Sequence, residues 1–356
     1  MNATRQLHAL GQSLWLDNIT HALLTSGTLD RYIRELAVTG LTSNPTIFDH
    51  AIKEGEFYDE AIRRTARAGM SDEALFFELA TADLVQAADL FRPIHDATDG
   101  VDGWVSLEVS PLLADDTAGS IKAAAELHAR AERPNFFIKI PGTRAGIPAI
   151  EESIFAGVPV NVTLLFSREH YIAAAEAYMR GVERRIAASL DPRIASVASV
   201  FVSRWDVAVG DRVSRALRNR LGIAVAMRTY EAYRELLGSP RWQKLAARGA
   251  LPQRLLWGST GTKDPTAPDG LYIESLAAPD TINTMPEKTL LAFADHGNVK
   301  GTMPTDGGDA EAVLADFAAA GINDGTLAAD LQREGTAAFV KSWNELIHRV
   351  ALKRTS

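Results

Sequence analysis

A single lysine, Lys139, lies inside the apolar run NFFIKIPGT (residues 135–143), between two isoleucines. Burial of an unpaired ammonium group is costly, so a lysine at this position needs an explanation. It could belong to an edge strand, with its amine in water. Alternatively, the amine is desolvated, which makes it partly neutral and able to attack a carbonyl. The run by itself leaves both interpretations open.

Other polar residues recur where apolar runs end. They are Asp17, Thr42, Asn44, Glu108, Lys139, Asn161, Thr163, Ser199, Arg204, Ser259 and Thr260. If the runs are strands of one parallel barrel, their carboxyl ends meet on one face, and several strands share the chemistry. Inward carboxylates, amides and an amine would otherwise destabilise a core, so this pattern indicates a site.

Eight short apolar runs predict strands at residues 14–19, 38–44, 104–109, 135–140, 158–166, 196–203, 254–260 and 280–285. Amphipathic stretches between them predict helices, including 167–190, 205–222 and a C-terminal helix over 334–354. Ser71 and Ser167 are predicted helix N-caps. This alternation predicts a single (β/α)8 TIM barrel with extra helices, formed as one domain by residues 1–356.

Composition narrows the class of protein further. The chain has 356 residues and a net charge of −8, which argues against nucleic acid or an anionic membrane as the main partner. It has no cysteine, which excludes disulfides and cysteine nucleophiles. The eight histidines are scattered and no glycine-rich phosphate loop is present, so we expect neither a metal nor a nucleotide cofactor. The N-terminus lacks a signal-peptide pattern, and we expect a cytoplasmic enzyme.

Four segments together carry a family resemblance. The segments GLTSNPTIF (40–48), SLEV (106–109), FFIKIPGTRAG (136–146) and NVTLLFS (161–167), in this order and spacing, resemble transaldolase, and the longer actinobacterial transaldolases most closely. Segments 196–206, 255–265 and 278–290 also have counterparts there, so the resemblance covers almost the whole chain. Transaldolases are class I aldolases of the pentose phosphate pathway. They move a dihydroxyacetone unit from sedoheptulose 7-phosphate or fructose 6-phosphate to glyceraldehyde 3-phosphate or erythrose 4-phosphate.

The resemblance implies a catalytic role for four residues. Lys139 resembles the Schiff-base lysine of the family. Glu108 and Thr163 match the residues that shuttle protons through a water, and Asp17 matches the aspartate that takes the C4 hydroxyl proton. The family uses no cofactor and no metal.

The resemblance also implies a set of substrate contacts. They are Thr42, Asn44, Asn161, Ser199, Phe201, Arg204, Ser259 and Lys263. The asparagines correspond to amides that hold substrate hydroxyls, whereas Ser199, Arg204 and Ser259 correspond to phosphate-binding positions. Lys263 takes the place of a second arginine of shorter relatives, and a lysine offers a point charge without a bidentate fork.

Structural roles compete with three of these assignments. Asp17 could cap the helix that follows it, although Asn18 could serve instead. Asn44 precedes Pro45, which is typical of a turn. Glu108 could form a tight ion pair with Lys139, but that pair would keep the amine charged, so we expect a water between the two side chains.

Two other functions remain open at this point. Fructose-6-phosphate aldolases release free dihydroxyacetone, but they carry glutamine at the position of Glu108 and tyrosine at the position of Phe201. A catalytically silent sugar-phosphate-binding barrel is the second alternative. Gly142 departs from the family, whose members carry alanine there, and should loosen the turn after the lysine strand. A homodimer is plausible by family.

Overall fold

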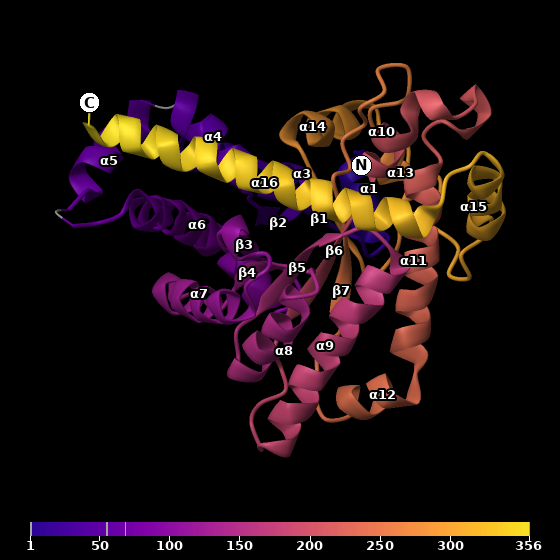
Figure 1. Ribbon diagram of the computed structural model, residues 1–356, viewed down its shortest axis with the longest axis horizontal. Coiled ribbons are helices and arrows are strands. Elements are labelled where there is room, and N and C mark those ends of the chain that lie inside the picture. The colour runs from indigo at the N-terminus through magenta and orange to yellow at the C-terminus, as the bar shows by residue number, and fades with distance from the viewer. Residues whose placement is uncertain (1, 55, 68, 356) are drawn as a thin grey trace.

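Eight parallel strands close into a barrel in the computed structural model, which describes residues 2–54, 56–67 and 69–355 (Figure 1). The strands pair in chain order, and β8 pairs with β1. Their bounds are β1 Ser13–Asp17, β2 Val38–Thr42, β3 Val105–Glu108, β4 Phe136–Pro141, β5 Val160–Leu165, β6 Ser196–Phe201, β7 Gln253–Gly258 and β8 Ile282–Met285. The predicted (β/α)8 fold is confirmed.

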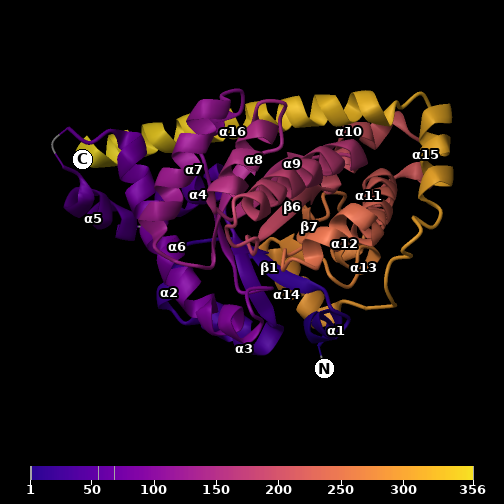
Figure 2. The same cartoon turned by 90° about the horizontal axis from the view of Figure 1, so that it is seen from below.

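Helices connect the strands and surround the barrel (Figures 1 and 2). They are α1 Ala3–Ala9, α2 His21–Thr25, α3 Thr28–Leu36, α4 Pro45–Glu54, α5 Glu56–Thr65, α6 Asp72–Ala97, α7 Thr117–Ala131, α8 Gly146–Ala156, α9 Arg168–Ala187, α10 Ser203–Val209, α11 Leu221–Gly238, α12 Pro240–Ala246, α13 Leu271–Ser275, α14 Glu287–His296, α15 Ala310–Ala319 and α16 Asp324–Thr355, with 3-10 turns η1 Pro111–Leu113, η2 Gly210–Arg212 and η3 Arg215–Leu217. The predicted caps are confirmed, because Ser71 and Ser167 accept from the backbone N–H groups of Ala74 and His170. None of the described helices is both long and apolar enough to cross a bilayer.

All eight predicted strands are present, and their ends differ from the prediction by at most two residues. The differences fall where a strand gives way to a cap or a turn. For example, β1 ends at Asp17 because the chain turns there toward α2, whose N-cap Thr20 accepts a hydrogen bond of 3.0 Å from the Leu23 N–H.

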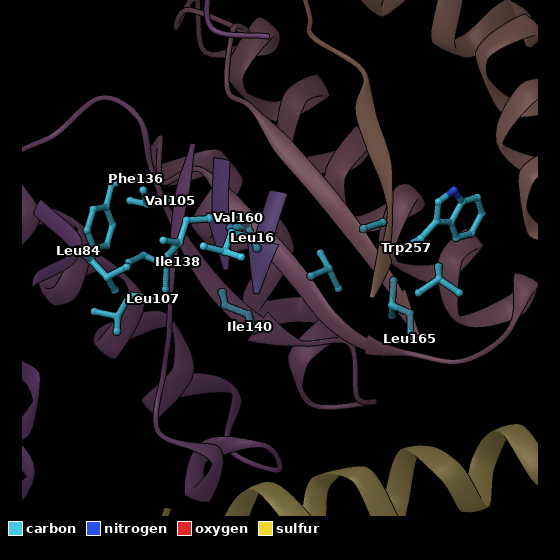
Figure 3. Close-up of a cluster of buried hydrophobic side chains, with 14 of the residues drawn as sticks. Leu16, Leu84, Val105, Leu107, Phe136, Ile138, Ile140, Val160, Leu165 and Trp257 are labelled. Carbon is cyan, nitrogen blue, oxygen red and sulfur yellow. The ribbon is translucent and has the colours of Figure 1, made fainter. Parts of the chain in front are cut away.

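Side-chain alternation along the strands divides the core into an outer and an inner part. Outward residues such as Leu107, Ile138 and Val160 pack against the helices (Figure 3). Inward residues in the amino-terminal half of the barrel form an apolar plug. It consists of Trp15, Trp104, Phe137, Ala195, Val197, Leu256 and Ile282. Trp104 stacks on Phe137 with 4.1 Å between ring centroids, so one end of the barrel is filled.

The helix predicted over 205–222 is wrong. The chain forms α10, then the two 3-10 turns η2 and η3, and α11 begins only at Leu221. The reason is a contact between residues far apart in sequence. Asp206 accepts hydrogen bonds from the backbone N–H groups of Leu221 and Gly222, at 2.9 and 3.2 Å, and caps α11 from the preceding helix. The apolar spacing of the segment could not reveal this break.

The predicted C-terminal helix is confirmed, but it is longer than expected. It begins at Asp324, ten residues before the predicted start at 334, and crosses the molecule as one straight rod (Figures 1 and 2). Both ends are held by ion pairs. Asp324 pairs with Arg228 of α11 at 2.6 Å, and Arg349 pairs with Asp49 of α4 at 2.7 Å. Helix α16 is therefore fixed to two sides of the barrel.

The capping carboxyl of Asp206 makes the stability of the fold depend on pH. Burial raises the pKa of Asp206 to about 6, against an ordinary value of 3.8. The folded chain therefore binds this proton more tightly than the unfolded chain. The resulting stabilisation is fully present below pH 3.8 and is lost as the pH rises through about 6.

We expect Asp206→Asn to remove this titration. The difference in unfolding free energy between wild type and variant should change by about 3 kcal/mol from about pH 4 to pH 7, with wild type losing more stability. Urea unfolding at stepped pH measures it, and any constant cost of the amide cancels in the slope. Asp211→Asn, at a fully exposed side chain, is the control. Parallel pH curves for wild type and Asp206→Asn would contradict the expectation.

Candidate active site

Polar side chains fill the carboxyl-terminal end of the barrel, directly above the apolar plug. On β1, Asp17 lies two residues beyond Trp15 of the plug, and on β4, Lys139 lies two residues beyond Phe137. Strand register places the polar residues beside one another. Glu108 is paired with Lys139, Lys139 with Asn161, and Asp17 with Thr42. Closure of the sheet thus brings together residues that are far apart in the sequence.

Lys139 is buried, with a residue exposure of 5%. Its strand, β4, pairs with β3 on one side and β5 on the other, so the edge-strand alternative is wrong. The Nζ atom donates a hydrogen bond of 3.0 Å to the Ser43 carbonyl and lies 3.4 Å from Glu108 Oε2. The amine is therefore held in position inside the barrel, away from bulk solvent.

Glu108 is buried beside this amine but not hydrogen-bonded to it. Charge-assisted N–H···O bonds are about 2.7–2.9 Å long, shorter than the 3.4 Å observed here. A distance of 3.4 Å leaves no room for a water directly between Nζ and Oε2, so the predicted intervening water is wrong. Neither carboxylate oxygen of Glu108, nor the Thr163 hydroxyl, has a hydrogen-bond partner among the described residues.

Burial raises the pKa of Glu108. The Lys139 ammonium opposes this rise, and the Asp17 carboxylate adds to it. A carboxyl group with unused lone pairs and a raised pKa, next to an amine, is suited to accept a proton and return it. The arrangement therefore favours proton transfer over a static ion pair.

Asp17, at the end of β1, lines the same cleft as Lys139. Its Oδ1 accepts a hydrogen bond of 2.7 Å from Thr42, whose hydroxyl also lies 2.7 Å from the Thr284 hydroxyl. Burial raises the pKa of Asp17, and Lys139 opposes the rise. The alternative role as a helix cap is wrong for Asp17, because Thr20 caps α2. It is also wrong for Asn18, which donates to Glu287 at 3.1 Å.

The two predicted amides differ in their surroundings. Asn161 is fully buried, donates to the Ser106 hydroxyl at 3.1 Å and accepts from the Ser199 hydroxyl at 2.7 Å. Asn44 lines the cleft and also accepts a hydrogen bond of 3.1 Å from the Ile47 N–H at the start of α4. Asn44 therefore caps α4 and does not form the predicted turn, and it also lines the cleft.

A cleft of about 270 Å³ opens above these groups. Its lining includes Asp17, Thr42, Asn44, Lys139, Thr163, Ser199, Phe201, Arg204, Ser259, Lys263, Thr284 and Phe339. Most of the predicted site residues therefore share one cavity. Glu108 and Asn161 are not part of this lining and lie on either side of Lys139, on the paired strands β3 and β5.

Positive charge gathers at one side of the cleft. Arg204 has no hydrogen bond or ion pair with any described residue, and its guanidinium lies 5.2 Å from the Phe201 ring centroid. Burial lowers the pKa of Arg204, and Glu108 partly offsets that. Lys263 is exposed at the rim, and Ser259 contacts the Ser203 hydroxyl at 2.8 Å. An uncommitted, half-buried guanidinium beside hydroxyl groups suits a bound anion.

The basic and acidic side chains of the cleft lining, counted together with the adjoining Glu108, do not balance. Lys139, Arg204 and Lys263 are cationic groups, whereas Asp17 and Glu108 are acidic. Three basic groups against two acidic ones favour an anionic ligand. In the part of the chain that the structure describes, no three His, Asp or Glu side chains are grouped so that they could hold a metal ion.

Three contributors were missed by sequence reasoning. The Ser43 carbonyl holds the lysine amine, the Thr284 hydroxyl contacts Thr42, and Phe339 closes the cleft from α16. The expectation that polar residues at strand ends line the site could have identified Thr284, which lies near the end of the eighth predicted strand. No local sequence signal identifies a backbone carbonyl as a partner of the lysine. Phe339 can be recognised in the sequence only as part of the apolar face of the C-terminal helix.

A family profile and individual relatives of this chain both indicate the same family. The profile of the Transaldolase/Fructose-6-phosphate aldolase family matches residues 14–350. A transaldolase of Parafrankia sp. (strain EAN1pec) is 45% identical over 353 residues, covering 97% of this chain and 96% of the relative. Transaldolases of Arthrobacter sp. (strain FB24) and Thermobifida fusca (strain YX) are each 46% identical, covering 97% and 98% of this chain and 95% and 97% of the relatives.

The turn after the lysine strand gives a stability prediction. Gly142 donates to the Thr163 carbonyl at 2.8 Å and accepts from Gln332 at 3.1 Å, so hydrogen bonds hold the turn on both sides. A Cβ at position 142 would overlap Leu165 Cδ2. We therefore expect Gly142→Ala to lower the unfolding free energy by about 1–3 kcal/mol through overpacking.

Adding Leu165→Val should relieve the overlap, so the double variant should lose less stability than the sum of the two single changes. Chemical denaturation of the four proteins measures the coupling. Gly238→Ala, where an added Cβ meets nothing within 4 Å, is the matched control. Strict additivity of the two changes would show that position 142 is not limited by Leu165.

Proposed function

Because the chain belongs to the transaldolase/fructose-6-phosphate aldolase family, we propose that it transfers a dihydroxyacetone unit between sugar phosphates through an imine at Lys139. The chain is an enzyme, a transferase of the transaldolase type, as the relatives that match it over nearly their whole length show. We propose both the substrates and the roles of the individual residues. The donor is sedoheptulose 7-phosphate or fructose 6-phosphate, and the acceptor is glyceraldehyde 3-phosphate or erythrose 4-phosphate.

One observation supports this proposal most directly. A buried lysine amine lies 3.4 Å from a buried carboxylate that has no hydrogen-bond partner among the described residues. A structural ion pair would normally satisfy the carboxylate oxygens, because unpaired buried charges are strongly destabilising. Free lone pairs beside a nucleophilic amine are instead what imine formation requires, since protons must move at each step.

Imine formation is the first stage. The neutral Lys139 amine attacks the C2 carbonyl of the ketose and gives a carbinolamine. The carbinolamine oxygen then takes up a proton and leaves as water, while the nitrogen forms the C=N bond. Glu108, with the Thr163 hydroxyl nearby in the barrel, supplies and recovers these protons. The Ser43 carbonyl, at 3.0 Å, keeps Nζ in place for the attack.

Carbon–carbon cleavage is the second stage. Asp17 takes the proton of the C4 hydroxyl, the C3–C4 bond breaks, and its electron pair passes into the imine to form an enamine. The aldose phosphate leaves with C4 as its aldehyde carbon. Thr42 holds the Asp17 carboxylate at 2.7 Å in the lining of the cleft. Asn44 and Asn161 hold the retained three-carbon unit.

The enamine then attacks the aldehyde of the acceptor, and water releases the new ketose phosphate. Arg204, with Ser199, Ser259 and Lys263, binds the substrate phosphate. Phe201 places an apolar ring against this region, so no hydroxyl from that position is available to activate water against the enamine. This supports transfer over release of free dihydroxyacetone.

Borohydride trapping tests the covalent step. Incubation with fructose 6-phosphate and borohydride should give a stable three-carbon adduct, which peptide mapping should assign to Lys139. Lys139→Ala should show neither adduct nor transfer activity, while Lys122→Ala, at an exposed lysine, should behave as wild type. Turnover without an adduct at Lys139 would refute the proposal.

The assignment of Asp17 has a separate test. Asp17→Asn should still form the imine, so borohydride should trap the intact six-carbon donor. Its kcat should fall by roughly 10²- to 10⁴-fold, the usual contribution of a general base. Rapid-quench assays and mass spectrometry of the adduct distinguish the two steps. Asp115→Asn, at an exposed position, is the control.

The same assignment predicts the acid side of the pH profile. Burial raises the pKa of Asp17 above its ordinary value of 3.8, and the base acts only when ionised. As the pH is lowered, activity should therefore begin to fall while the pH is still above 3.8. The reason is that the buried base takes up its proton at a higher pH than an exposed aspartate does. Unchanged turnover of Asp17→Asn across this range would remove Asp17 from its role.

A further inference from the structure

One face of the C-terminal helix takes part in the candidate site. Gln332, Gly335 and Phe339 are spaced three and four residues apart on α16, so they lie on the same side of the helix. Each contacts the carboxyl-terminal end of the barrel, and Phe339 lines the cleft. We call these three residues the cleft face of α16.

Gln332 holds two backbone carbonyls at the site. Its Nε2 donates to the Gly142 carbonyl at 3.1 Å and to the Leu164 carbonyl at 2.9 Å. Leu164 has φ of 58°, a left-handed conformation that is strained for a leucine. It follows Thr163 within an irregularity of the β5–β6 pairing, where bulges re-aim side chains. Gln332 thus fixes the strained segment next to Thr163.

Gly335 and Phe339 surround the Arg204 guanidinium. The guanidinium carbon lies 5.2 Å from the Phe201 ring centroid and 5.6 Å from that of Phe339. Both are within the range of cation–π contacts. A Cβ added at Gly335 would lie 3.1 Å from Arg204 Nη1 and 3.0 Å from Leu164 Cδ2. The guanidinium therefore packs closely against position 335, and a side chain there would displace it by a few tenths of an ångström.

A glycine in the middle of a helix is unfavourable for the helix itself, since it has greater freedom in the unfolded chain. Gly335 lies well inside α16, which runs from Asp324 to Thr355. Its backbone has no left-handed φ, so helix geometry does not require glycine there. The contact with Arg204 gives the absence of a side chain a physical reason.

We propose that Gly335 and Phe339 are positioning residues for phosphate recognition: together they hold the Arg204 guanidinium in the orientation that receives the substrate phosphate. This inference rests on the proposed function and extends it to a helix far away in the sequence. Arg204 has no acidic partner among the described residues. The rings of Phe201 and Phe339 and the absence of a side chain at Gly335 orient its guanidinium, so all its donors stay available for an anion.

Gly335→Ala separates this role from simple packing. The far ends of the Arg204 and Leu164 side chains can both give way by a few tenths of an ångström, so the variant should fold, with a thermal midpoint close to that of wild type. The displaced guanidinium should raise KM for fructose 6-phosphate on the order of ten-fold, with kcat within about two-fold of wild type. Activity with unphosphorylated fructose should be unchanged, since it does not use Arg204.

Gly325→Ala is the matched control on the same helix. An added Cβ there meets only Asn323 Oδ1 at 3.5 Å, far from Arg204, so KM should stay at the wild-type value. Phe339→Leu, which keeps apolar volume but removes the ring, should also raise KM selectively. Phe339→Tyr, which keeps the ring, should restore most of the affinity.

Titration with inorganic phosphate gives a readout independent of turnover. Gly335→Ala and Phe339→Leu should weaken phosphate binding, and Gly325→Ala should not. Equal changes in KM for fructose and fructose 6-phosphate, or unchanged phosphate affinity in both variants, would overturn the inference. Absence of transfer by the wild type would refute the proposed function instead, while weakened phosphate binding in the two variants would still support the positioning role.

Discussion

Closure of the strand barrel removes an amine and one carboxyl group from water and half-buries a second carboxyl group, and the rest of the site depends on this shared burial. Lys139 and Glu108 are exposed by only 5% and 4%, on neighbouring strands whose register sets their separation. Burial favours uncharged forms, which is why the pKa values of Asp17 and Glu108 are raised. The raised pKa values make it easier for these two carboxyl groups to take up a proton.

Two structural layers maintain this environment. Below the polar groups, the apolar plug fills the barrel with aromatic and aliphatic side chains, of which Trp15 and Phe137 are almost fully buried. Above them, α16 closes part of the mouth and fixes Leu164 and Gly142 through Gln332. The reacting groups stand on strands between these layers, so small displacements that would misplace them are resisted from both sides.

Much of the fold and of the candidate site could be predicted from sequence. Short apolar runs with polar ends can be recognised without knowing what each strand packs against. They predict all eight strands. Residues such as Lys139 and Asp17 could be assigned to one cavity because strand ends of a parallel barrel converge by necessity. The family resemblance supplied roles that periodicity cannot, and comparison with known proteins confirms that resemblance.

The sequence by itself determined the alternation of strands and helices and the residue types available at the strand ends. Only the tertiary structure decided what each group faces. It replaced Asp17 by Thr20 as the helix cap, divided the predicted helix through the contact of Asp206 with Leu221, and brought α16 to the cleft. Gln332 and Leu164 are 168 residues apart. Periodicity reports local geometry, whereas such contacts follow from closure of the whole barrel.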